Sequence, residues 1–226
     1  SKDTEKKCML GAKKCSGRAS PESTWIYSAM LQNKINHSYL SLITDDFGVW
    51  QHANGKVPAK EHGYALDDSA RALIVFLELH DFVHAKTCLT YLESSYQNGK
   101  IVGFFDQHRT VVVQESSEDA LGLALWALAY AIHAKFELAR TQKLYDQLRD
   151  MGVPESKYVR PHAYSLIANT LVGNDTAAKR DQDHIIDRYR SDIHWFEESL
   201  RYANGVIPYA LLIQCQRNPN DNLLKI

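Results

Sequence analysis

The feature that most constrains the fold is a succession of apolar helical patterns separated by short polar breaks. In segment 64–80, Leu66, Ala70, Leu73 and Leu77 recur every three or four residues, which is the spacing of one face of an α-helix. Similar patterns, ended by Gly or Asn-Gly, cover most of the chain. We therefore predict an all-α fold. The predicted helices are 23–43, 64–80, 82–96, 116–135, 136–151, 158–172, 177–189, 193–202 and 207–216.

One segment departs from helical spacing. Two runs rich in β-branched and aromatic residues, 101–105 and 110–113, flank the polar turn Asp106-Gln107-His108-Arg109. Such runs on either side of a turn are typical of a hairpin. We predict a short β-hairpin excursion near 100–114.

A weak internal repeat suggests how the helices are arranged. Asp67-Asp68 opens one long predicted helix, and Glu118-Asp119 opens another 51 residues later. A period of about two helices with their links indicates stacked helical hairpins. It fits an (α/α) toroid of hairpins, complete or incomplete, better than a compact bundle. We expect residues 1–20 to form a basic tail and 21–226 a single helical domain.

Composition and charge exclude several classes of partner. The formal net charge is -1, without the basic excess that nucleic-acid binding requires, so we expect no nucleic-acid partner. No apolar run reaches membrane-spanning length, and no charged start is followed by an apolar run, so we expect neither a membrane span nor a secretory signal. The sequence predicts a cytoplasmic protein and leaves its oligomeric state open.

The cysteines give no sign of a metal site. None of the four stands in a Cys-x-x-Cys pair, and Cys88 lies among apolar residues, as a small buried hydrophobe would. His52 and His62 are ten residues apart, which matches no standard metal motif. We therefore predict no metal and no cofactor.

Adjacent carboxylates mark the starts of two long predicted helices. Cleavage of a glycosidic bond needs two carboxyl groups: one protonated, to donate to the leaving oxygen, and one ionised, to activate water or attack the anomeric carbon. Acidic pairs at the mouths of helices could supply both. The candidate catalytic residues are Asp67, Asp68, Glu118 and Asp119.

The same residues also have a purely structural interpretation. Acidic side chains in the first turn of a helix offset the macrodipole and cap free amides. Ser116 and Asp119 have the spacing of a capping box. Asp67 and Arg71 are four apart and can pair on a helix surface. The residues alone leave both interpretations open.

Polar and aromatic side chains near the acidic pairs are candidates for holding a sugar. Imidazole, guanidinium and carboxylate groups can bind hydroxyls, and aromatic rings can pack on the apolar faces of sugar rings. The candidate substrate-binding residues are His52, His62, Tyr64, Arg71, Arg109, Trp195 and Glu197.

Several motifs together resemble a known family. Gln51-His52-Ala53, His62-Gly63-Tyr64 and Asp67-Asp68-x-Ala70-Arg71-Ala72-Leu73, with later short matches such as Trp195-Phe196-Glu197, resemble a microbial glycosidase-like helical domain. That domain occurs alone or joined to glycosyltransferases and is similar to the six-hairpin (α/α) toroids. The resemblance implies a funnel at one end of the inner helices, where Asp67, Asp68, Glu118, Asp119 and Glu197 would converge. The chain departs from the family at Ser69, where Asn is usual, and at Leu123, where Arg is usual.

These observations lead to one main functional hypothesis and two alternatives. The main hypothesis is a glycoside hydrolase acting on an oligosaccharide or sugar conjugate, so the expected partner is a carbohydrate ligand. The first alternative is a non-catalytic carbohydrate-binding domain. The second is a sugar epimerase or lyase on a similar fold, with His52 or His62 as the base.

Overall fold

A computed structural model describes residues 36–113, 116–151, 153–220 and 223. The chain divides into two units, Ser1–Asn36 and His37–Ile226, and the second unit holds nearly all the described residues. The predicted tail 1–20 and most of the predicted helix 23–43 lie outside the described residues. The fold below is that of the second unit.

The second unit is predominantly helical, as the apolar spacing predicts. Most predicted helices are confirmed to within a few residues at each end. The α-helices are α2 (Ser38–Leu42), α3 (Leu66–Glu78), α4 (Phe82–Ser95), α5 (Glu118–His133), α6 (Leu138–Leu148), α7 (Val159–Val172), α8 (Asp175–Ile186) and α9 (Val206–Arg217). Two short 3₁₀ helices, η1 (Lys60–His62) and η2 (Val153–Glu155), lie in the connections.

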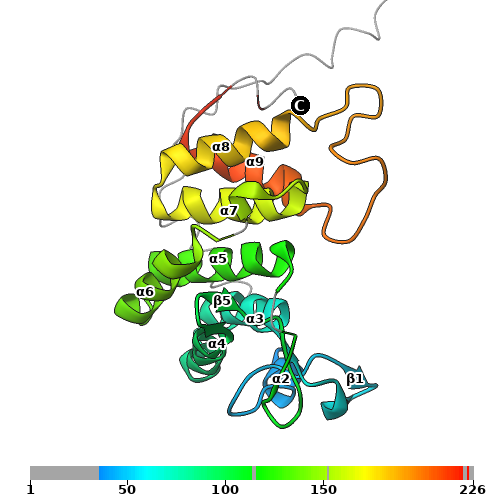
Figure 1. The fold of residues 1–226 in the computed structure, drawn as a ribbon, viewed down its shortest axis with the longest axis vertical. Coiled ribbons are helices and arrows are strands. Elements are labelled where there is room, and N and C mark those ends of the chain that lie inside the picture. Colours follow the sequence, from blue (N-terminus) through cyan, green and yellow to red (C-terminus); the bar gives the residue numbers. More distant parts are fainter. Residues whose placement is uncertain (1–35, 114–115, 152, 221–222, 224–226) are drawn as a thin grey trace, which may run out of the picture. The chain divides into compact units, whose positions relative to one another are not determined.

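The helices are arranged as successive hairpins. α4 packs on α3, α6 on α5 and α8 on α7, while α3, α5, α7 and α9 contact one another in that order (Figure 1). We call α3, α5, α7 and α9 the inner helices. The described ranges hold three hairpins and α9, so stacked hairpins are seen there, while closure into a six-hairpin toroid remains a prediction.

Contacts between side chains show that the inner helices are parallel. Near their carboxyl ends, Tyr130 of α5 bonds to Glu78 of α3, and Thr170 of α7 donates to Gln214 of α9 at 2.8 Å. Near their starts, Arg160 of α7 lies 3.5 Å from Asp119 of α5. The amino-terminal ends of these helices therefore lie at the same end of the row.

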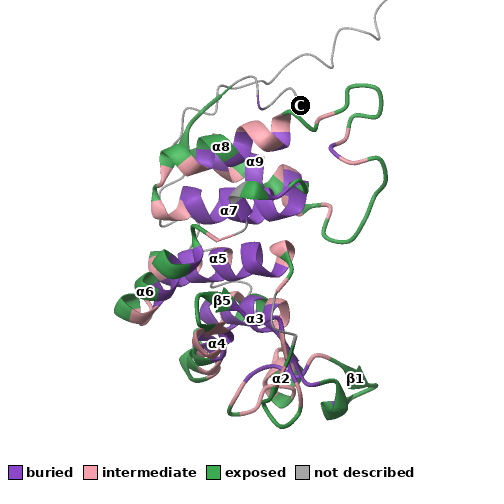
Figure 2. Cartoon of the chain, in the orientation of Figure 1, coloured by how far each residue is buried: buried purple, intermediate pink, exposed green. Residues whose placement is uncertain are grey.

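Helix α7 is buried along nearly its whole length (Figure 2). It contacts α5, α8 and α9, so no broad face is left for solvent. Gly122 permits the approach of α5, because a Cβ atom there would lie 3.1 Å from both the Pro161 carbonyl oxygen and the Tyr164 Cβ. A side chain at Gly122 would push the two helices apart.

Short strands lie before α3 and in the connection between α4 and α5. The predicted hairpin near 100–114 is confirmed for β6 (Phe104–Phe105) and β7 (Val111–Val113), which pair antiparallel. β6 also pairs with β3 (Tyr64–Ala65), and Ile101 pairs instead with Tyr96. The remaining strands are β1 (Ala53–Asn54), β2 (Val57–Pro58), β4 (Tyr96–Gln97) and β5 (Lys100–Ile101).

Two local predictions are wrong. Segment 193–202 is not a helix: Arg190 and Trp195 form an antiparallel bridge, and His194 has a φ of 52°. Its apolar residues do not share a face, since Leu200 is 76% exposed whereas Phe196 is buried. The helix cap before α5 is Ser117, not Ser116, because the Ser117 hydroxyl accepts the amide hydrogen of Ala120.

Candidate functional site

A cavity of about 620 Å³ is bordered by all four inner helices. Residues near the starts of all four helices, together with the loop before α9, form the wall. The lining residues are Arg71, Ile74 and Val75 of α3, Leu123 and Trp126 of α5, Tyr164 of α7, and Ala203, Gly205, Val206 and Tyr209 of the last loop and α9.

Charged residues stand one helical turn before these lining residues. Asp67 precedes Arg71, Asp119 precedes Leu123 and Arg160 precedes Tyr164, each by four residues. Residues four apart lie on the same helix face, one above the other. We call the set Asp67, Asp68, Arg71, Glu118, Asp119, Arg160 and Glu197 the rim, because these residues lie near the amino-terminal ends of the inner helices or bond to residues there.

The α3 part of the rim is an arginine shared by two carboxylates. The Arg71 Nη1 donates to Asp67 Oδ2 at 2.9 Å and to Asp68 Oδ1 at 3.0 Å. Burial raises the pKa of Asp68, and the charge of Asp67 raises it further, against the opposing effects of Arg71 and His52. The His52 ring lies edge-on to that of His62 at 4.6 Å between centroids. Both predicted histidines are therefore on the Asp68 side of the site.

The α5 and α7 part of the rim is a second, more buried arginine with two carboxylates. Arg160 donates from Nη1 to both Glu197 oxygens, at 2.9 and 2.7 Å, and its Nε lies 3.5 Å from Asp119 Oδ2. Tyr202 donates to the same Asp119 oxygen and packs its ring 4.5 Å from the guanidinium carbon. Burial raises the pKa of Asp119, with Arg160 opposing.

Tyr164 connects the two parts of the rim. Burial raises the pKa of its hydroxyl, and the negative charges of Asp119 and Asp67 act in the same direction, while Arg71 and Arg160 oppose them. Charged residues from both parts of the rim therefore affect the pKa of Tyr164, which lies in the cavity wall. Asp67 and Asp68 thus bond to Arg71, which lines the cavity, while Asp119 and Glu197 bond to Arg160, one helical turn before Tyr164 of the cavity wall.

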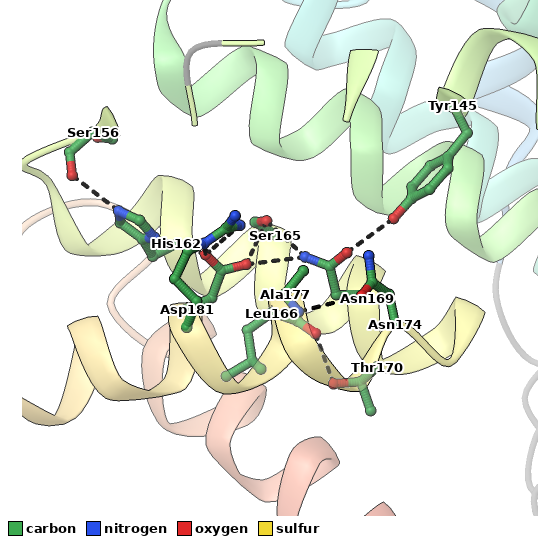
Figure 3. Close-up of polar contacts among 11 residues, drawn as sticks. Tyr145, Ser156, His162, Ser165, Leu166, Asn169, Thr170, Asn174, Ala177 and Asp181 are labelled. Carbon is green, nitrogen blue, oxygen red and sulfur yellow. Dashed lines mark hydrogen bonds and ion pairs between the residues drawn. The ribbon is translucent and has the colours of Figure 1, made fainter. Parts of the chain in front are cut away.

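Glu118 is held by a network that runs into the core. Its Oε2 accepts the Ser156 hydroxyl hydrogen at 2.5 Å, and the Ser156 carbonyl accepts from His162 Nε2 at 2.9 Å. The other His162 nitrogen lies 2.9 Å from Asp181, which is fully buried (Figure 3). This network fixes segment 153–158 against α7 and thereby orients Glu118.

The network continues beyond Asp181 through neutral side chains. Asp181 Oδ2 accepts from the Ser165 hydroxyl at 2.6 Å and from the Asn169 amide at 3.0 Å, and Tyr145 donates to Asn169 at 3.1 Å (Figure 3). Arg180 adds a charged donor at 3.0 Å. Both oxygens of the buried Asp181 carboxylate are thus satisfied by hydrogen-bond donors.

Three predicted site residues lie elsewhere. Tyr64 is 1% exposed and donates its hydroxyl hydrogen to Asp45, so it offers a ligand almost no surface. Arg109 is paired with Asp46 rather than with a rim acid. Trp195 lines a separate cavity of about 210 Å³ between its loop and α9.

The sequence interpretation left out several residues that form the site. Four of them are not among the residues predicted from the sequence: Arg160, Trp126, Tyr164 and Tyr209. Two of them could have been predicted from their spacing. Trp126 follows Asp119 by seven residues and Tyr164 follows Arg160 by four, so each lies on the same helix face as a rim residue.

Two general properties of the described residues bear on the site. No three of their His, Cys, Asp or Glu side chains come together as a group that could hold a metal ion. None of the described helices is both long and apolar enough to cross a membrane.

Comparison of the chain with protein-family models, with curated proteins and with solved structures finds no significant match. The geometry of the cavity and its rim therefore provides the basis for the function proposed below.

Proposed function

We propose that this chain hydrolyses a glycosidic bond in an oligosaccharide or sugar conjugate, on a fold that is a portion of an (α/α) toroid. The observation that carries the proposal is that four carboxyl groups bond to two arginines at one aromatic-lined cavity: Asp67 and Asp68 to Arg71 in its wall, and Asp119 and Glu197 to Arg160 one helical turn before it. Trp126 and Tyr164 stack at 6.1 Å between ring centroids and give the cavity an aromatic wall.

The proposal assigns different work to different carboxyl groups. A proton donor must hold its proton near neutral pH, which requires a raised pKa. Burial raises the pKa of Asp68 and of Asp119, so these two are the candidate donors. Asp67 or Glu118 then serves as the ionised base or nucleophile. Ser156 orients Glu118 by donating to it.

The test is turnover by the purified chain on a panel of oligosaccharides and sugar conjugates, with products identified by mass. We expect Asp68→Asn and Glu118→Gln each to abolish cleavage while the far-ultraviolet circular dichroism is unchanged. Asp146→Asn is the matched control, because this carboxylate lies on α6, away from the cavity lining, and its partners are the surface residues Arg149 and Gln142, each at 3.2 Å. Full cleavage by both rim variants would overturn the proposal.

A second candidate function is non-catalytic carbohydrate binding. It is favoured by the pairing within the rim: Arg71 bonds to Asp67 and Asp68, and Arg160 bonds to Asp119 and Glu197. Such pairs can hold sugar hydroxyls without transferring a proton. Binding of a glycan with no product, in wild type at every pH between 4 and 8, would select this second function.

A further inference from the structure

The cavity is charged at its rim and apolar below it. The rim is charged, whereas the wall beneath it is made of Ile74, Val75, Leu123, Trp126, Val206 and Tyr209, which we call the floor. Of the residues that line the cavity, Arg71 is the one that carries a full charge, and it is already bonded to Asp67 and Asp68. The floor therefore offers a ligand mainly hydrocarbon and aromatic surface.

A sugar ring fits the rim better than the floor. Each hydroxyl that leaves water without a hydrogen-bond partner costs about 1–3 kcal/mol, and hexoses carry several hydroxyls. The carboxylates and arginines of the rim can satisfy them, whereas Ile74, Val75 and Leu123 cannot. The group that occupies the floor should therefore be apolar.

Two floor residues are exposed although they belong to packed helices. Val75 of α3 is 42% exposed and Tyr209 of α9 is 47% exposed, and both face the same cavity. A ligand that covers them removes apolar surface from water, which favours binding. A polar head at the rim and an apolar group on the floor match the two ends of an amphiphilic molecule.

We propose that the floor binds the alkyl chain of a glycolipid whose sugar lies at the rim. The sugar half of this inference rests on the proposed function. The alkyl half rests on the composition of the floor alone. The cavity volume, about 620 Å³, is within the range of ligand-binding pockets.

The test is calorimetric titration of the whole chain with methyl, butyl, hexyl and octyl β-D-glucosides and the matching β-D-galactosides, each below its micelle concentration. We expect affinity to rise about fourfold per buried methylene group, with the same slope for both sugars, until the chain fills the floor. Affinity that does not depend on chain length would overturn the inference. So would a higher affinity for phenyl glucoside combined with a flat alkyl series.

Matched variants locate the effect on the floor. Val75→Asn and Tyr209→Ser change exposed residues, so the fold should persist, and each should lower the octyl glucoside affinity about tenfold while leaving the methyl glucoside affinity unchanged. The controls are Val83→Asn on α4, at a site that is 76% exposed, and Leu212→Ser on α9, which faces the smaller cavity. Equal effects of floor variants and controls would overturn the assignment.

The same data separate this inference from the proposed function. A chain-length slope without any hydrolysis would support the alkyl site and count against the hydrolase. Hydrolysis with equal kcat/KM for methyl and octyl glycosides and a flat titration series would support the hydrolase and overturn the alkyl site.

Discussion

Replacement of Arg160 by Met tests whether the deeper half of the rim is held by a buried charge pair. The Arg160 side chain is 8% exposed, and its partners Asp119 and Glu197 are 19% and 16% exposed. Methionine keeps the length of the alkyl stem and removes the donors. Glu197 would then remain as an unpaired charge in a poorly hydrated place, and the Asp119 carboxyl group beside it would lose its guanidinium partner.

The expected cost follows from that burial. Removing one partner of a fully buried ion pair costs about 3–5 kcal/mol. Because the two carboxylates retain some access to water, we expect Arg160→Met to lower the free energy of unfolding by about 2–4 kcal/mol. Arg71→Met is the matched control: its bonds are 2.9 and 3.0 Å long, but the side chain is 44% exposed. Exposed pairs contribute about 0–1 kcal/mol.

Urea unfolding at pH 7, followed by circular dichroism, measures both values. A double-mutant cycle with Glu197→Gln should give a coupling energy of about 2 kcal/mol for the Arg160–Glu197 pair. If Arg160→Met cost no more than Arg71→Met, burial would not be what strengthens the pair. The reasoning about the rim would then be refuted.

Two further predictions concern packing and titration. Gly122→Ala should cost about 1–3 kcal/mol in urea unfolding, because the new Cβ would meet Pro161 and Tyr164 at 3.1 Å, whereas Gly205→Ala, with nothing within 4 Å, should be nearly neutral. Burial raises the pKa of Asp68 above its ordinary value of 3.8, so the native state binds the Asp68 proton more tightly than the unfolded state does. The free energy of unfolding of wild type should therefore fall relative to that of Asp68→Asn as pH rises from about 4 to 7. Arg109 lowers the pKa of Asp46 below 3.8, so the stability that this carboxylate adds is lost only as pH falls below about 4, and wild type and Asp46→Asn should show no relative trend between about pH 4 and 7. A fall equal to that of the Asp68 comparison would contradict the assignment.

The sequence predicted the helices well because their apolar spacing reflects tertiary burial. In α3 the buried residues Leu66, Ala70, Leu73 and Leu77 are the ones whose spacing predicts the helix. The helix predicted over 193–202 does not form, because this segment is held by contacts with residues distant in sequence. Its aromatic residues are held by a backbone bridge and by contacts with α9, which depend on residues distant in sequence and leave no periodic pattern.

The candidate site was predictable only in part. The acidic pairs stand out in the sequence because they are adjacent and repeat after 51 residues. Their partner Arg160 does not stand out, because its pairing with Glu197 joins residues 37 apart across an irregular loop. Tyr64 and Arg109 were selected for their residue types, and the structure instead pairs them with Asp45 and Asp46.

Helix capping and chemistry need not be competing explanations of the acidic pairs. The amino terminus of a helix favours an ionised carboxylate, which lowers its pKa. For Asp68 and Asp119 burial acts in the opposite direction and raises both pKa values. These residues are equivalent in the 51-residue repeat, and each follows an acid that accepts from a side-chain donor: Asp67 from Arg71, which Asp68 shares, and Glu118 from Ser156. A carboxyl group that only capped a helix would gain nothing from such burial, whereas a proton donor requires it.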